Sequence, residues 1–346
     1  MKERNSYLLS YHADKGSALC IAALSVFLTP VARSRGTTRS AMLTKVLITG
    51  ASGYLGQHLL TSLASDSSLK LHAAYGQLPS FVEDFGAMAE CSSLDLQDEA
   101  AVRALVGSIQ PDVVIHLAAV SSPAVCEKEP ESSRAINCPM ALIEALPAHA
   151  SLIFLSTDQV YDGLKGTYTE SDAAKPVNLY GQAKLDFEAA LQAALPSRSV
   201  SLRSSLILGP PTPGRCRKQS FLQFCDEKLG AGEKTNFFGD EVRSVVFVAD
   251  IVRLLSWLLK GGVAAGCVGV HNMGGPQRLT RVDVAMAVAA HRGHDTALVA
   301  AVNRADVVPA GAVASPPDIS MDSSKLALAS GIAATTLADM VSRSFV

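Results

Sequence analysis

Residues 49–56, Thr49-Gly50-Ala51-Ser52-Gly53-Tyr54-Leu55-Gly56, decide the fold of this chain. They follow a short β-branched run at 45–49 and open a stretch at 55–63 whose leucines recur at helical spacing. A glycine turn between the first strand and the first helix of a domain indicates dinucleotide binding. Its glycines are three and three residues apart, whereas typical dehydrogenases have two and three.

Each glycine of this turn has a separate physical task. Gly50 permits the tight turn, Gly53 lets the backbone approach a pyrophosphate, and Gly56 allows close packing of the helix on the strand. The N-terminus of the helix adds free N–H groups and partial positive charge. We therefore expect the cofactor's phosphates to lie against Gly50, Ser52, Gly53, Tyr54, Leu55 and Gly56.

Strands and helices alternate along the next 150 residues. The patterns predict further strands at 69–74, 112–117, 151–156 and 200–206, a strand closing at Leu94, and helices at 98–109, 131–146 and 180–194. This alternation is typical of a parallel sheet with right-handed crossovers. We expect an α/β fold with a doubly wound parallel sheet, the Rossmann-like architecture that binds NAD(P).

The regular alternation of strands and helices ends after residue 208. Proline and glycine, which disfavour helices and strands, are concentrated there in Pro210-Pro211-Thr212-Pro213-Gly214. Beyond this stretch the patterns predict helices at 219–229 and 251–259 and a strand at 245–248. We expect the dinucleotide-binding domain at 43–208 and a smaller substrate-binding lobe, interwoven with it, at 209–346.

Residues 1–42 form a predicted N-terminal extension with two interpretations. An apolar run at 18–28, followed by an Arg-, Ser- and Thr-rich stretch at 29–40, is typical of an organelle-targeting or signal peptide, although Glu3 and Asp14 weaken that reading. The other interpretation is an upstream addition to a protein that starts at Met42. The apolar run is shorter than the roughly 20 residues that span a bilayer, so no membrane association is expected.

Composition narrows the functional classes. The net charge of −2 and an aromatic content of 5% give no basic surface or stacking platform for nucleic acid. The seven cysteines are scattered without a C-x-x-C pair, which argues against a metal site and against a disulfide framework. A reducing compartment, the cytoplasm, is the expected location unless residues 1–41 direct the chain to an organelle.

A candidate catalytic set lies in the second half of the nucleotide-binding domain. Tyr180-Gly-Gln-Ala-Lys184 places two side chains four residues apart on one helix face. A lysine near the tyrosine favours the phenolate and brings the tyrosine's pKa of ~10 toward working pH. Tyr180 would then exchange a proton with a carbonyl or alcohol oxygen while hydride moves at a nicotinamide. A buried strand upstream ends in Ser156-Thr157-Asp158, whose hydroxyl would bind the same oxygen.

These motifs together resemble the extended short-chain dehydrogenase/reductases. The resemblance covers about residues 42–325 and rests on five stretches: 49–56, 94–96, 116–119, 156–163 and 180–184. Residues 156–163 and 318–325 look like the dTDP-4-dehydrorhamnose reductase branch. The resemblance implies that Thr157, Tyr180 and Lys184 are catalytic and that Asp158 contacts substrate. It places Arg243 where sugar-nucleotide enzymes bind a phosphate, and adds Asp95, Leu96, Ala118, Ala119 and Val120 to the cofactor site.

The same branch contains the regulatory β subunit of methionine adenosyltransferase, which keeps the nucleotide fold but acts as a partner protein. Residues 122–127 and 162–186 look more like that subunit than like the reductases. Two functions therefore stay open: a reductase of a 4-keto nucleotide sugar, and a non-catalytic subunit that binds methionine adenosyltransferase in S-adenosylmethionine biosynthesis. A homodimer is compatible with either.

The sequence marks cofactor choice weakly. The second strand runs out at Ala73-Ala74-Tyr75-Gly76, with neither a carboxylate for a ribose 2′-hydroxyl nor an arginine for a 2′-phosphate. A carboxylate would repel the phosphate, so its absence favours NADP, with NAD as the alternative.

Overall fold

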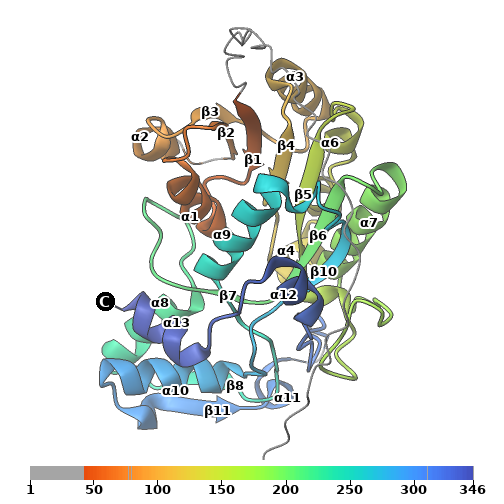
Figure 1. Ribbon diagram of the computed structural model, residues 1–346. Coiled ribbons are helices and arrows are strands. Elements are labelled where there is room, and N and C mark those ends of the chain that lie inside the picture. The colour runs from red at the N-terminus through yellow and green to blue at the C-terminus, as the bar shows by residue number, and fades with distance from the viewer. Residues whose placement is uncertain (1–42, 77, 79, 310, 346) are drawn as a thin grey trace, which may run out of the picture. The chain divides into compact units, whose positions relative to one another are not determined.

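The protein is described here by a computed structural model of residues 43–345, apart from 77, 79 and 310. The predicted N-terminal extension lies outside the described residues, so neither of its interpretations is tested. A seven-stranded sheet organises the rest, in the order β10-β6-β5-β4-β1-β2-β3 with every pairing parallel (Figure 1). Its strands are β1 (Thr44–Thr49), β2 (Leu69–Tyr75), β3 (Glu90–Ser93), β4 (Val113–His116), β5 (Ser151–Thr157), β6 (Ser199–Ser204) and β10 (Gly269–Met273). The predicted α/β fold is confirmed.

Helices cover both faces of this sheet because successive strand side chains point to opposite sides. In β1, Val46 and Ile48 pack with α1 (Tyr54–Leu63) and α9 (Val248–Trp257), while Leu47 lies in a separate core on the other face. That second core contains α3 (Glu99–Ile109), α6 (Met140–Glu144) and α7 (Leu179–Ala194). A short helix, α2 (Phe81–Phe85), closes the first core beside β2.

A second lobe has its own apolar core below the sheet (Figure 1). Its elements are α8 (Phe221–Gly230), β8 (Thr235–Phe238), α10 (Arg281–Arg292), β11 (Val299–Val302) and α13 (Leu337–Ser344). The short helix α11 (Arg304–Val307) follows β11 in the chain. A two-stranded ribbon of β7 (Ile207–Leu208) and β9 (Val246–Phe247) leads into it. The chain returns from this lobe to the large sheet twice, first as α9 and β10 and then as α12 (Ser324–Ser330), which packs on β10. The expected boundary at residue 208 stays a prediction.

Two sequence expectations are corrected by the structure. The single helix predicted at 131–146 is broken, because α5 (Pro130–Asn137) ends at Cys138 and Pro139 has no N–H to continue the helical ladder. An additional short helix, α4 (Pro123–Lys128), precedes it. Strand β10 was not predicted, since His271 and Asn272 interrupt its apolar pattern although both are buried.

A buried ion pair joins α7 to the sheet. Arg203 of β6 and Glu188 of α7 are 5% and 3% exposed, and the guanidinium binds the carboxylate through Nη2–Oε2 at 2.7 Å and Nε–Oε1 at 3.1 Å. Ser156 of β5 donates to the same carboxylate at 2.5 Å. Arg203 Nη1 also donates to the Tyr161 hydroxyl at 2.9 Å, which donates to Asn272 Oδ1 of β10 at 2.8 Å.

Breaking this pair from one side should be costly. Arg203→Met leaves the Glu188 carboxylate buried without its partner, so we expect the free energy of unfolding to fall by ~3–5 kcal/mol in urea denaturation. Arg103→Met, which removes an exposed guanidinium from Glu99 and Glu144, is the control and should cost ~1 kcal/mol or less. Equal losses in the two variants would contradict a structural role for the buried pair.

Candidate active site

The glycine turn lies where the strand order reverses, between β1 and β4. Gly50 has φ 69°, and a Cβ added there would lie 2.6 Å from the backbone nitrogen of Ala118. Only glycine therefore allows the turn after β1 to approach the segment after β4 this closely. Ligands of open parallel sheets bind at this reversal, beyond the carboxyl ends of the strands.

The first turn of α1 is open to a ligand. Gly53 is its N-cap, no side chain caps the helix, and a Cβ at Gly53 would meet only the Gly50 carbonyl, at 3.2 Å. At Gly56 a Cβ would lie 2.6 Å from the carbonyl oxygens of Gly50 and Ala51. N–H groups without a side-chain cap at a helix N-terminus suit an anion such as a pyrophosphate, and Gly56 provides the close packing.

The loop at 209–219 covers the side of this turn, which the sequence did not predict. The Tyr54 hydroxyl donates to the Pro210 carbonyl at 2.7 Å, and the buried Gln57 amide binds both the Gly214 N–H and the Arg215 carbonyl. The Arg215 guanidinium reaches Glu83 and Asp84 of α2 at 2.6 and 2.8 Å. The proline cluster showed that a loop is there, but no local pattern shows where it folds.

The other expected cofactor residues also follow strand ends. Asp95 is exposed and accepts from the Gln97 N–H at 3.0 Å, whereas the Leu96 side chain is buried in the core, so only its backbone faces outward. Ala119 is exposed. The Val120 N–H donates to Asn137 Oδ1 of α5 at 2.9 Å, and the Val120 carbonyl accepts from Asn137 Nδ2 at 3.2 Å.

The three expected catalytic residues are brought together and buried. Thr157 ends β5, while Tyr180 and Lys184 lie one turn apart near the start of α7, with exposures of 5%, 8% and 1%. The α7 N-terminus is fixed by Asn178, whose side chain accepts from the Gly181 N–H at 2.9 Å. Burial raises the pKa of Tyr180 above its ordinary value, and a hydrogen bond with Thr157 offsets part of the rise.

Lys184 contacts two residues of β5, and the expectation that Lys184, held near Tyr180 and a ribose, lowers the pKa of Tyr180 stays a prediction. Lys184 Nζ donates to the Leu155 carbonyl at 2.9 Å and lies 4.4 Å from the centre of the Phe154 ring. Burial lowers the pKa of Lys184 itself to about 7, against a partial opposing effect of Glu188. A lysine that carries only part of a charge stabilises a phenolate weakly.

Asp158 and Arg243 lie beside the catalytic set. Asp158 is 5% exposed and accepts from Ser205 at 2.8 Å and from Thr157 at 3.2 Å. Burial raises its pKa, and the charge of Arg243 opposes this. Arg243 is 9% exposed and donates to the Val242 and Pro317 carbonyls. Ser205 was missed, because only strand pairing brings it next to a residue 47 positions earlier.

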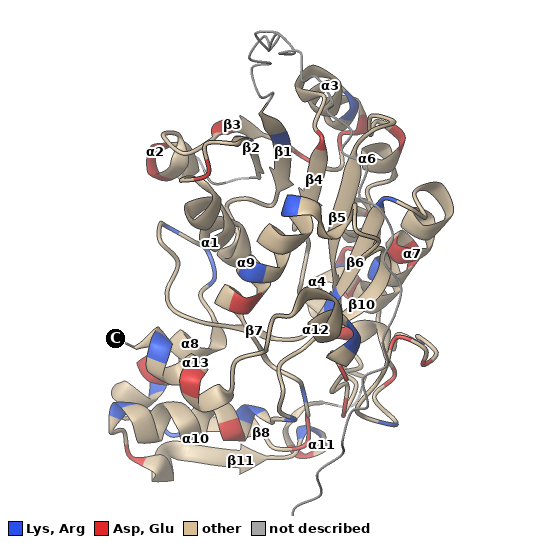
Figure 2. Cartoon of the chain, viewed as in Figure 1, with Lys and Arg blue, Asp and Glu red and all other residues tan. Residues whose placement is uncertain are grey.

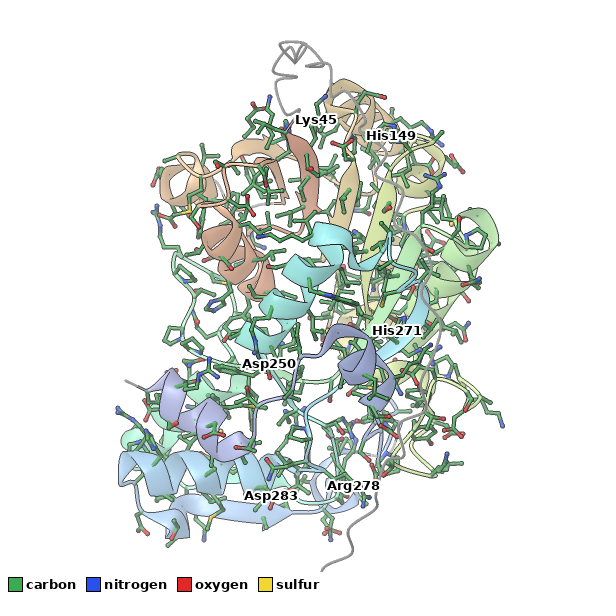
Figure 3. All side chains as sticks on the ribbon, in the orientation of Figure 1. Lys45, His149, Asp250, His271, Arg278 and Asp283 are labelled. Carbon is green, nitrogen blue, oxygen red and sulfur yellow. The ribbon has the colours of Figure 1, made fainter. Side chains whose placement is uncertain are left out.

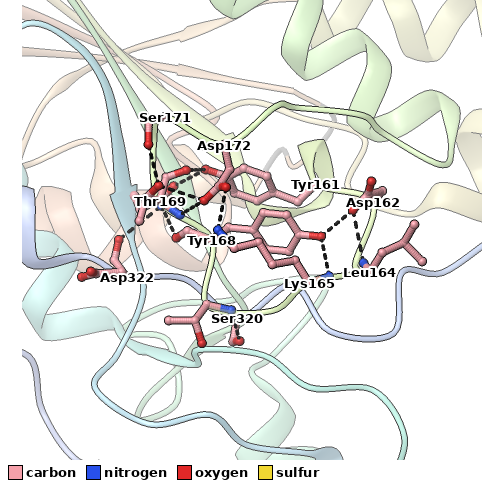
Figure 4. Close-up of polar contacts among 12 residues, drawn as sticks. Tyr161, Asp162, Leu164, Lys165, Tyr168, Thr169, Ser171, Asp172, Ser320 and Asp322 are labelled. Atoms are coloured by element: carbon pink, nitrogen blue, oxygen red, sulfur yellow. Dashed lines mark hydrogen bonds and ion pairs between the residues drawn. The ribbon is translucent and has the colours of Figure 1, made fainter.

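The loop after Asp158 is anchored on the C-terminal segment (Figure 4). Tyr161 and Tyr168 stack with ring centres 4.3 Å apart, and the Tyr168 hydroxyl bonds to Asp162. The backbone of Tyr168 pairs with that of Ser320, and the Asp322 N–H donates to the Tyr168 carbonyl at 2.8 Å. The two stretches that resemble the reductase branch, 156–163 and 318–325, are therefore neighbours in space.

Within the described residues, no three His, Cys, Asp or Glu side chains are placed to hold a metal ion. None of the helices outside the masked positions is both long and apolar enough to cross a membrane.

The parallel sheet with a glycine turn at its reversal point defines a Rossmann-like dinucleotide-binding protein. The profile of the RmlD substrate binding domain matches residues 44–345, so the chain belongs to that family of the extended short-chain dehydrogenase/reductases. The resemblance expected from the sequence is confirmed.

Curated relatives come from both branches considered above. Methionine adenosyltransferase 2 subunit beta of Danio rerio is 35% identical over 48% of this chain and 48% of its own length. The Xenopus laevis subunit is 29% identical over 71% of each chain. The dTDP-4-dehydrorhamnose reductase of Mycolicibacterium smegmatis is 32% identical over 67% of this chain and 65% of its own.

Solved structures confirm the fold. The dTDP-4-dehydrorhamnose reductase of Bacillus anthracis, in complex with NADP, has a TM-score of 0.74 at 21% identity and covers 88% of this chain and 99% of its own. A UDP-glucose 4-epimerase of Thermotoga maritima has a TM-score of 0.73 at 21% identity, over 87% and 97% of the two chains.

Filling the space above Gly53 should prevent cofactor binding. We expect Gly53→Val to weaken NADPH binding about tenfold or more in a fluorescence titration, because the branched side chain displaces the phosphates from the α1 N–H groups. Gly107→Val is the matched control, since a Cβ at Gly107 has open space around it. Wild-type affinity in Gly53→Val would show that the phosphates bind elsewhere.

The buried amine of Lys184 should make stability depend on pH. Its pKa is about 7 in the fold against an ordinary 10.5, so between these values the unfolded chain binds more protons and stability rises with pH. We expect Lys184→Met to be more stable than wild type at pH 7, with a gap that narrows toward pH 10 in urea denaturation. A gap that stays constant over this range would contradict the lowered pKa.

Proposed function

We propose that this protein is an NADP(H)-dependent reductase of a 4-keto nucleotide sugar, with NAD as the alternative cofactor. The observation that carries the proposal is the burial of Thr157, Tyr180 and Lys184 together at the strand ends next to the open turn at Gly53. A tyrosine hydroxyl beside a threonine hydroxyl suits proton donation to a carbonyl oxygen. The relatives named reductase support this assignment.

Each protein group has a defined task in this reaction. Residues 50–56 and the backbone of 118–120 would hold the cofactor, which would supply hydride for the substrate carbonyl carbon. Tyr180 donates its proton to the developing alkoxide, while Thr157 holds the same oxygen by a hydrogen bond. Asp158 and Arg243 contact the substrate beyond the carbonyl. The low exposure of these four side chains keeps water from the reacting oxygen, which strengthens each of these interactions.

A bound cofactor would contact the Lys184 amine. Its Nζ has a single protein acceptor, the Leu155 carbonyl. An ammonium has three donors, so it can also bind hydroxyls of a ribose next to Tyr180. Such contacts favour the charged amine, which then stabilises the Tyr180 phenolate left after proton donation.

A second candidate function is the regulatory one, a subunit of methionine adenosyltransferase. The observation that favours it is the recurrence of subunit beta among the relatives, at 25–35% identity. In that case the turn and the Tyr180–Lys184 pair serve to bind NADP, and the protein contacts the synthetase through its surface.

Tyr180→Phe separates the two functions. For a reductase, the change removes the proton donor and keeps the ring, so we expect kcat on a dTDP- or UDP-4-keto sugar to fall ~10²-fold or more with NADPH affinity little changed. The assay follows NADPH absorbance with wild type and the variant side by side.

The regulatory function can also be tested directly, through the kinetics of methionine adenosyltransferase. Wild-type protein that consumes no NADPH with these sugars, yet changes the kinetics of methionine adenosyltransferase, would contradict the reductase assignment. Tyr180→Phe should then leave that regulatory effect intact, because docking requires no proton transfer.

A further inference from the structure

A polar cavity of about 240 Å³ lies between α3 and the end of the sheet at which β1, β2 and β3 begin. The candidate active site is at the other end, beyond the carboxyl ends of the strands. Figure 3 places Lys45 and His149 at the end that holds the cavity, and Figure 2 shows a basic position on β1 and an acidic one on β3 there. The polar side chains that line the cavity are Lys45, Lys70, His72, Glu90, Ser92 and Ser108.

Strand pairing brings the charged groups of this cavity together. In the parallel register Lys45 of β1 pairs with Lys70 of β2, and His72 of β2 pairs with Glu90 of β3. Side chains two residues apart on a strand share a face, so Lys70 and His72 point to the same side of the sheet. Lys45 shares its face with Leu47, which belongs to the core on the α3 side. Two ammonium groups, an imidazole and a carboxylate therefore face α3 together.

The lining carries more positive than negative charge. Lys70 Nζ lies 2.8 Å from Glu90 Oε1, and Lys45 Nζ donates to the Ile109 carbonyl at 3.0 Å. An ammonium has three donors, and these contacts use one donor of each lysine. Among the described residues that line the cavity, Glu90 is the one carboxylate. Two ammonium groups against one carboxylate leave a surplus of one positive charge.

His72 is a buried polar group that the folded chain satisfies only in part. The residue is 8% exposed, and its Nδ1 lies 3.2 Å from Glu90 Oε2. Its Nε2 is enclosed and has no hydrogen-bond partner among the described residues, although such groups are usually paired.

The charge of this imidazole depends on its surroundings. Burial lowers the pKa of His72, Glu90 opposes this effect, and the charges of Lys70 and Lys45 add to it. The α3 side chains that line the cavity carry no charge. Asp112, which accepts from the Lys45 backbone N–H at 2.8 Å, is not part of the lining. An anion that enters between the lysines would therefore favour the protonated imidazole and raise the surplus to two positive charges.

We propose that this cavity binds a phosphate group, either inorganic phosphate or a small phosphate monoester, between Lys45, Lys70 and His72. The doubly charged group matches the surplus that protonation of His72 completes. Its oxygens can accept from both lysines, from the Ser92 hydroxyl and from His72 Nε2, while Nδ1 donates to Glu90. The cavity has the volume of about eight water molecules, at ~30 Å³ each, which leaves room for a group attached to the phosphate. This site is separate from the turn proposed to hold the cofactor.

Sulfate is the first probe, because it has the shape of phosphate and keeps both charges from pH 6 to pH 8, where phosphate itself titrates. In isothermal titration calorimetry at constant ionic strength, we expect Lys45→Gln and Lys70→Gln each to weaken sulfate binding about tenfold or more, the loss of one charge-assisted hydrogen bond. Lys228→Gln is the matched control and should bind as wild type does, because Lys228 pairs with Glu233 at 2.8 Å in the other lobe.

The pH dependence tests the part assigned to His72. Wild type should bind sulfate more tightly at pH 6 than at pH 8, because the imidazole takes up a proton as the anion binds. His72→Gln should remove this difference. Inorganic phosphate and glycerol phosphate, compared at one pH, then distinguish the two sources: tighter binding of the ester assigns the site to a phosphate monoester, and the reverse assigns it to the free ion.

Several results would overturn the proposal: no sulfate binding by wild type, or equal binding by wild type, Lys45→Gln and Lys70→Gln. Sulfate binding that Gly53→Val abolishes and the lysine variants keep would place the ion at the cofactor turn and reject this site. If His72→Gln fails to fold, Lys70→Gln still decides, because the Lys70 side chain is 44% exposed. NADPH affinity should stay unchanged in both lysine variants, so the outcome here is independent of the reductase assignment.

Discussion

The ion pair between Glu188 and Arg203 is the interaction on which the candidate active site depends. It fixes α7 against β5 and β6 in the interior, where a mispaired charge is expensive. Because Tyr180 and Lys184 lie two turns and one turn before Glu188 on the same helix, the pair also fixes their distance from Thr157. Its extension through Tyr161 to Asn272 holds the last strand of the sheet in the same network.

The polar interior also explains why the free protein holds its reactive groups in unreactive states. Burial raises the pKa of Tyr180 and lowers that of Lys184 to about 7, so each is favoured in its neutral form. Desolvation produces both shifts, and both oppose proton transfer until a further charge or hydroxyl enters. A closed, dry site of this kind therefore gains its catalytic electrostatics from the ligands it binds.

The local features of this site could be predicted from the sequence, and the distant ones could not. The glycine turn and the Tyr180–Lys184 spacing depend on a few adjacent residues, and the structure places them as expected. Ser205 meets Asp158 only because β5 pairs with β6, and the Gln57 amide meets the Arg215 carbonyl only because the loop at 209–219 folds against the turn after β1. Pro139 could have predicted the break between α5 and α6, but the apolar periodicity across it favoured one continuous helix. The spacing of Tyr180 and Lys184 gives no measure of burial, so the rise that burial causes in the pKa of Tyr180 could not be predicted.

The path of the chain between the two layers has a consequence for how such proteins diversify. The lower lobe is assembled from separate stretches, and α9 and β10 between them belong to the sheet layer. Recombination that exchanges one continuous segment would therefore bring foreign strands into the sheet or leave the lobe's core half replaced. New ligand preference in this architecture is more accessible through point changes at positions such as Ser315, whose hydroxyl accepts from Arg243 and which lies outside the lobe's apolar core.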